Sequence, residues 1–201
     1  MRDRINALAR RVPVWAVWLA GLVPGVWALY LGLTGGLGAE PIKALEQELG
    51  LVALQLLVAG IAITPLRRHL GVNLIRFRRA LGLLAFTYVS LHLAVWLLLD
   101  VQDAARVWAD IVKRPYVTVG FTAFVLMIPL AITSNDLSLR RLGPRWRWLH
   151  RLTYAVIVLG AVHFIWLSKG FQIEPLVYLG AILGLLALRL PVFKHSVRGP
   201  L

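Results

Sequence analysis

The stretch LGLLAFTYVSLHLAVWLLLD, residues 81–100, is an almost entirely apolar run. An α-helix needs about 20 mostly apolar residues to cross the hydrocarbon core of a bilayer, and this run supplies them. One imidazole, that of His92, lies inside the run. A ring that ionises and forms hydrogen bonds is costly in hydrocarbon, so its presence predicts a specific partner within the membrane.

The composition of the whole chain also indicates a membrane protein. Of its 201 residues, 59% are hydrophobic and 15% are charged, and the mean hydropathy is +0.75. An ordinary soluble domain does not need so apolar a composition. The apolar segments that are long enough, or nearly so, to span a bilayer are residues 13–33, 49–66, 80–99, 116–133, 149–168 and 175–193. We therefore predict an all-α polytopic membrane protein, a six-helix transmembrane bundle that forms one domain over residues 1–201.

The first apolar run has a basic head and small residues behind it, as a signal peptide does. It is longer than a signal-peptide core of about 7 to 15 residues, and it contains tryptophans typical of membrane interfaces. We interpret it as a transmembrane helix.

The net charge is +13, and most of the basic residues lie in predicted loops and at the chain ends. Of the 22 Lys and Arg residues, 17 lie at the N-terminus, after the second and fourth spans, and at the C-terminal end. Positively charged loops stay on the cytoplasmic side, so we expect both termini in the cytoplasm. Topology accounts for the basic residues, and the expected partner is the lipid bilayer and no nucleic acid.

The sequence lacks several kinds of reactive site. It has no cysteine, which excludes disulfides, iron–sulfur clusters and thiolate ligation of haem by this chain. No zinc-protease motif, paired-carboxylate site or glycine-rich phosphate loop is visible. We predict no catalytic residues, and electrons for any redox role must come from a separate donor.

One loop on the predicted outer side has its own pattern. Apolar residues recur at helical spacing over residues 101–112, with charged residues between them. This pattern predicts an amphipathic helix parallel to the membrane surface. It is either a docking surface for a partner or a connector that rests on the headgroups.

Two histidines share one predicted depth. His92 follows Arg79 by 13 residues and His163 follows Leu149 by 14, which places both rings about 20 Å from the inner ends of their spans. Two imidazoles at one level can ligate a single haem iron from opposite faces. Each ring alone is also compatible with a hydrogen bond to a backbone carbonyl or a hydroxyl group.

His150 lies at the inner mouth of the fifth span, 13 residues before His163. On a straight helix these two rings lie on different faces. Its role is left open among ligand of a second haem, partner of a quinone or flavin, and solvated interfacial residue. The basic residues near the inner face are candidates for binding haem propionates or a flavin phosphate: Arg78, Arg79, Arg147 and Arg151.

Five motifs then point to a family. They are RRALGLLAFTYVSLH (78–92), KRPYVTVG (113–120), PLAITS (129–134), RRLGPRWRWLHRLTY (140–154) and HFIW (163–166). Together, and in this order, they resemble the MsrQ family, also called YedZ. That family is the haem-binding membrane subunit of the bacterial MsrPQ methionine sulfoxide reductase system, and it belongs with the ferric reductase-like transmembrane domains.

The resemblance implies a function that composition does not show. Members are inner-membrane proteins that pass electrons from the quinone pool through b-type haem to MsrP, a periplasmic molybdenum-cofactor enzyme that reduces methionine sulfoxide in oxidised proteins. FMN is also ascribed to the family. By the same resemblance, His92 and His163 match the outer haem ligands, and His150 matches the third family histidine.

The chain departs from the wider superfamily at one position. NADPH oxidases and ferric reductases usually carry a second histidine 13 residues before the one at His92, where this sequence has Arg79. We therefore expect one firmly held haem and an incomplete second site. Two other functions compete: a ferric reductase-like carrier that reduces external metal chelates, and a proton-coupled transporter that uses His92 and His163 as relay groups. The sequence shows no internal repeat of the kind common in transporters.

Overall fold

The structure, a computed structural model, describes residues 2–168 and 172–190. Every regular element in these ranges is a helix, so the all-α prediction is confirmed. The α-helices are α1 (Arg2–Arg11), α2 (Val14–Leu33), α3 (Pro41–Pro65), α4 (Arg78–Val95), α5 (Ala104–Lys113), α6 (Pro115–Ile132), α7 (Asp136–Leu142), α8 (Pro144–Leu149), α9 (Leu152–Leu167) and α10 (Ile173–Ala187). Short π- or 3₁₀-helical turns flank α3 and α4: η1 (Leu66–Leu70), η2 (Ile75–Phe77) and η3 (Trp96–Val101).

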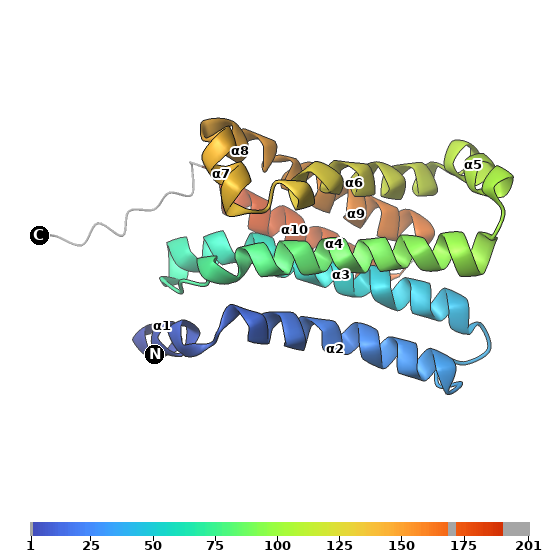
Figure 1. The fold of residues 1–201 in the computed structure, drawn as a ribbon, viewed down its shortest axis with the longest axis horizontal. Helices are drawn as coiled ribbons and strands as arrows, with labels where there is room; N and C mark the ends of the chain where they lie inside the picture. The colour runs from blue at the N-terminus through green and yellow to red at the C-terminus, as the bar shows by residue number, and fades with distance from the viewer. Residues whose placement is uncertain (1, 169–171, 191–201) are drawn as a thin grey trace, which may run out of the picture.

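The long helices run side by side along the long axis of the molecule (Figure 1). Among the described residues, five helical segments are long and apolar enough to cross a membrane. They are Val14–Leu33, Pro41–Leu70, Ile75–Val101, Pro115–Ile132 and Pro144–Leu167. The sixth expected span corresponds to α10, which is apolar but has 15 residues. The predicted end of that span, residues 191–193, lies outside the described residues.

The helix of the second span begins before its apolar part. We predicted an apolar span over residues 49–66, and the helix that contains its apolar part, α3, begins at Pro41. Proline suits the first turn of a helix, where its missing N–H costs nothing. The helix therefore runs from this proline through the polar turns that hold Lys43 and Glu46 before it becomes apolar.

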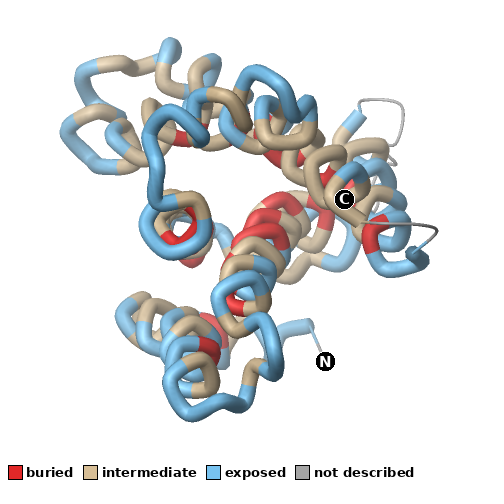
Figure 2. The backbone as a smooth tube through the Cα atoms, turned by 90° about the vertical axis from the view of Figure 1, so that its right-hand side faces the viewer, coloured by how far each residue is buried: buried red, intermediate tan, exposed pale blue. Residues whose placement is uncertain are grey.

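The main core lies between α3, α4, α6, α9 and α10. Its most deeply buried side chains come from four of these helices and include Ile61, Ala85, Ile157 and Ile182. Buried residues concentrate where these helices face each other, and the outer surfaces are exposed (Figure 2). Many exposed residues are large and apolar, such as Leu19, Val23 and Val26 of α2, which suits a surface in contact with lipid.

Helix α2 is joined to α4 by one tyrosine. The Tyr88 hydroxyl donates to the Gly21 carbonyl (2.7 Å) and accepts from the Gly25 N–H (2.8 Å). These two backbone groups would bond each other in a regular helix, so the hydroxyl is inserted into the turn that also contains Pro24. A Cβ at Gly25 would come within 3.0 Å of the tyrosine ring, so glycine permits this close approach.

The two ends of the bundle differ in character. Helix α5 lies at one end, and α1, α7 and α8 lie at the other (Figure 1). The amphipathic segment predicted over residues 101–112 forms a helix, α5, from residue 104, and the Asp103 side chain caps it by accepting from the Ala105 N–H at 2.7 Å.

The basic segments expected on one side also meet in space. Arg76 donates to the Arg10 carbonyl, and Arg68 donates to the Arg189 carbonyl. These contacts join α1, the loop after α3 and the end of α10 at the end of the bundle away from α5. Three basic residues that entered the charge count lie outside the described residues: Lys169, Lys194 and Arg198.

Candidate functional site

His92 lies on the last turns of α4 and faces α3. Its Nδ1 is 2.8 Å from the backbone carbonyl oxygen of Glu46. A carbonyl only accepts hydrogen bonds, so Nδ1 carries the proton and donates it. In the neutral imidazole the Nε2 atom is then unprotonated, and its lone pair is available to a metal.

His163 on α9 repeats this arrangement against α6. Its Nδ1 is 2.7 Å from the backbone carbonyl oxygen of Tyr116. The same reasoning makes Nδ1 the donor and leaves the Nε2 lone pair free. Metal-bound histidines commonly donate their second N–H to a carbonyl in this way, which fixes the tautomer and the ring orientation.

The structure brings these two rings together. Their centroids are 6.2 Å apart, and the ring planes are inclined by 81°. Imidazole nitrogens bind metals at about 2 Å, so two rings that share one metal through Nε2 have centroids about 6 Å apart. The observed spacing fits a shared metal. Among the described residues no group of three or more His, Cys, Asp or Glu side chains is positioned to hold a metal ion. A two-imidazole site therefore suits an iron whose other ligands come from a porphyrin.

His150 lies elsewhere, between α8 and α9 at the end of the bundle away from α5. Its ring stacks on Trp146 with centroids 3.8 Å apart, and its Nε2 is 3.0 Å from the Thr133 hydroxyl. That hydroxyl also lies 2.6 Å from the Pro129 carbonyl, to which it donates. His150 Nε2 therefore carries a proton and donates to Thr133, and Nδ1 is the nitrogen with a free lone pair.

Comparison with known proteins decides the family. A model of the ferric reductase like transmembrane component matches residues 46–161. The heme-binding subunit MsrQ of protein-methionine-sulfoxide reductase from Brucella anthropi is 46% identical over 178 residues, which is 88% of this chain and 81% of the relative. The protein of the same name from Agrobacterium fabrum is 46% identical over 178 residues, or 88% of this chain and 83% of the relative. This chain belongs to the MsrQ family. The resemblance seen in the sequence motifs is thereby confirmed.

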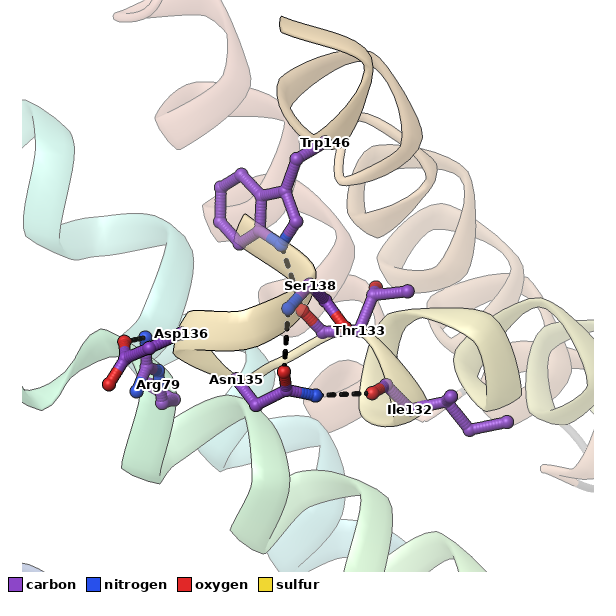
Figure 3. A network of polar contacts seen from close by, with 7 residues as sticks. All are labelled: Arg79, Ile132, Thr133, Asn135, Asp136, Ser138 and Trp146. Carbon is purple, nitrogen blue, oxygen red and sulfur yellow. Dashed lines mark hydrogen bonds and ion pairs between the residues drawn. The ribbon is translucent and has the colours of Figure 1, made fainter. Parts of the chain in front are cut away.

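The four arginines that we predicted near the inner face of this MsrQ-family chain are not equivalent. Arg79 is paired with Asp136 at 2.6 Å, next to the Asn135 side chain that caps α7 (Figure 3). Arg78, Arg147 and Arg151 are exposed and form no ion pair with a described residue. Arg78 is close enough to Arg189 and Tyr154 to interact with both electrostatically. Of the predicted basic residues, Arg79 is thus the one already neutralised.

Several contacts in this region were not predicted from the sequence. Arg189 donates to the Tyr154 hydroxyl at 2.8 Å and to the Ile61 carbonyl, and its guanidinium lies over the Tyr154 ring. Its Nε is buried and has no hydrogen-bond partner among the described residues. A backbone carbonyl was one of the partners expected for each histidine, but the sequence did not indicate which carbonyl, because every residue type supplies the same group and only helix packing selects one.

Proposed function

We propose that this MsrQ-family chain is an electron-delivery subunit. It takes electrons from the quinone pool of the bacterial inner membrane and passes them to MsrP, a periplasmic molybdenum-cofactor enzyme that reduces methionine sulfoxide. The chain supplies no catalytic residues to that reduction. The observation that carries the proposal is the pair of imidazoles 6.2 Å apart, each with Nδ1 engaged by a backbone carbonyl.

His92 and His163 are the residues that would hold the iron of a b-type haem. The haem, when bound, supplies a one-electron carrier within the membrane. The protein holds each Nδ1 proton on a carbonyl, so the imidazoles are presented as neutral ligands with fixed orientation. Quinol oxidation releases two electrons and two protons, and reduction of a sulfoxide to a thioether and water consumes the same numbers. The electron count of donor and acceptor therefore balances.

The ligand assignment is tested by absorption spectroscopy of the purified protein. Protein from haem-replete cells is expected to show a low-spin b-type spectrum that His92→Ala and His163→Ala each abolish. His69→Ala is the matched control, because the His69 ring is exposed and its contact is the Leu188 carbonyl at 3.3 Å. Retention of the full spectrum in either ligand variant would contradict the proposal.

A second candidate function has one observation in its favour. The family model that matches residues 46–161 is that of the ferric reductase like transmembrane component, so reduction of external ferric chelates is an alternative. Dithionite-reduced protein can be mixed with MsrP plus methionine sulfoxide, or with a ferric chelate. Reoxidation that is fast with the first and slow with the second supports the MsrP role, and the opposite result supports the alternative.

We also propose a binding role for the end of the bundle that we expect to face the cytoplasm. Arg78, Arg147 and Arg151 carry charges that no described carboxylate neutralises, which supports binding of an anionic group such as a flavin phosphate or a haem propionate. FMN is the flavin expected from the family. His150 adds a second nitrogen donor there, for a second haem or a quinone. Haem and flavin content per chain, measured for wild type and for His150→Ala, separates these roles.

A further inference from the structure

Two glycines face the two histidine rings. A Cβ added at Gly50 of α3 would lie 3.1 Å from Nδ1 and 3.3 Å from Cε1 of His92. The Nδ1 atom donates to the carbonyl of Glu46, four residues before Gly50. In an α-helix the N–H of residue 50 donates to the carbonyl of residue 46. The His92 ring therefore contacts the helical turn that runs from Glu46 to Gly50.

The same relationship recurs in the other helix pair. A Cβ at Gly120 of α6 would lie 2.7 Å from Nδ1 and 2.8 Å from Cε1 of His163. The ring donates to the carbonyl of Tyr116, again four residues earlier. Side-chain atoms do not come so close to a Cβ, so an alanine at position 120 requires the ring or the helix to move.

Among the described residues, the only other helical glycine that faces a ring is Gly25 of α2, against Tyr88. A Cβ at Gly60 of α3, Gly82 of α4 or Gly180 of α10 would meet nothing within 4 Å. A glycine that makes room for a ring is therefore a local feature and not a property of every helical glycine described. The two histidine cases lie on separate helix pairs, and in both the ring is one of the two proposed iron ligands.

We propose that Gly50 and Gly120 are positioning residues for the haem ligands. Their missing side chains let each imidazole reach the carbonyl four residues earlier, which fixes the Nδ1 proton and aims Nε2 at the iron. This inference rests on the proposed function. A methyl group at either position pushes the ring off its carbonyl, and loss of such a partner typically weakens metal binding about 10- to 100-fold.

The test compares Gly50→Ala and Gly120→Ala with Gly60→Ala and Gly160→Ala in the full-length purified protein. Gly60 shares α3 with Gly50, and Gly160 shares α9 with His163; a Cβ at Gly160 makes one ordinary contact, 3.8 Å from Leu54. We expect haem content to fall most in Gly120→Ala, less in Gly50→Ala, and not in the two controls. Full haem retention in Gly120→Ala would overturn the inference.

A second readout concerns the orientation of the rings. The two imidazole planes are inclined by 81°, and the largest g value of a low-spin ferric haem held by both rings would depend on that angle. Near-perpendicular planes give a highly anisotropic electron paramagnetic resonance signal. We expect this signal in wild type and a shifted one in the haem that Gly50→Ala retains, whereas a signal identical to wild type would contradict a positioning role for Gly50.

Double variants separate positioning from plain helix packing. In a His163→Ala background no ring meets the new methyl group, so adding Gly120→Ala should not lower the melting temperature. A fall as large as the one that Gly120→Ala causes with His163 present would show that the glycine serves helix packing alone. Wild-type protein without haem would instead overturn the proposed function, and wild-type haem with unaffected glycine variants would overturn only this inference.

Discussion

Among single side chains, Thr133 determines the state of His150. Its hydroxyl accepts from His150 Nε2 at 3.0 Å, and Thr133→Val removes the acceptor while keeping the shape of the side chain. The imidazole N–H is then left without a partner in a partly buried site, which costs about 1–3 kcal/mol. We expect a lower free energy of unfolding in detergent for this variant. Thr133→Ser keeps the hydroxyl and is expected to stay close to wild type; equal losses in both variants would show that the methyl group matters and the hydrogen bond does not.

Asp136 carries a pH-dependent contribution. The hydrogen bond from Arg79, together with the guanidinium charge, lowers the pKa of this exposed carboxyl below its ordinary value of 3.8. A depressed carboxyl pKa stabilises the fold above the unfolded-state pKa, and this contribution is lost as the pH falls through the folded-state value. We expect Asp136→Asn to lower the melting temperature slightly at pH 7, because exposed ion pairs contribute little. The difference from wild type should shrink towards pH 3, and a difference that grows there would contradict the assignment.

At the level of whole helices, Tyr88 connects α2 to the rest of the bundle through hydrogen bonds. Its hydroxyl occupies the opened turn between Gly21 and Gly25, and hydrocarbon provides no substitute partner for those backbone groups. Tyr88→Phe is expected to reduce the free energy of unfolding by about 1–3 kcal/mol. Chemical unfolding in detergent measures this loss. Tyr30→Phe is the control, since that ring is 54% exposed on α2; a loss as large in Tyr30→Phe would argue against the bridge.

For the molecule as a whole, the distribution of charge predicts its orientation. We expect position 43 to face the periplasm and position 145 to face the cytoplasm, because basic loops are retained inside. The chain has no cysteine, so Lys43→Cys and Arg145→Cys each create a single labelling site. A membrane-impermeant thiol reagent added to cells with a permeabilised outer membrane should label the first and spare the second. Labelling of position 145 alone would mean that the orientation is reversed.

Much of this architecture follows from local sequence properties. The length of each apolar run predicts a membrane helix, and a rise of about 1.5 Å per residue predicts that His92 and His163 share a depth. Each of these estimates uses the sequence of a single helix. The polar first turns of α3, which begins at Pro41, lay outside the predicted span, because hydropathy detects the apolar part of a helix and not its polar start.

From the amino-acid sequence we could predict the membrane class, the helical content, the grouping of the basic segments at one end and the common level of the two imidazoles. The packing of the helices was needed to show which way the rings point and which carbonyls and glycines they meet, and it also produces the contacts of Arg189 with Ile61 and Tyr154. Apolar length and charge act within a single helix. The rotation of one helix against another depends on packing between distant segments, and every backbone carbonyl is chemically the same until that packing selects one.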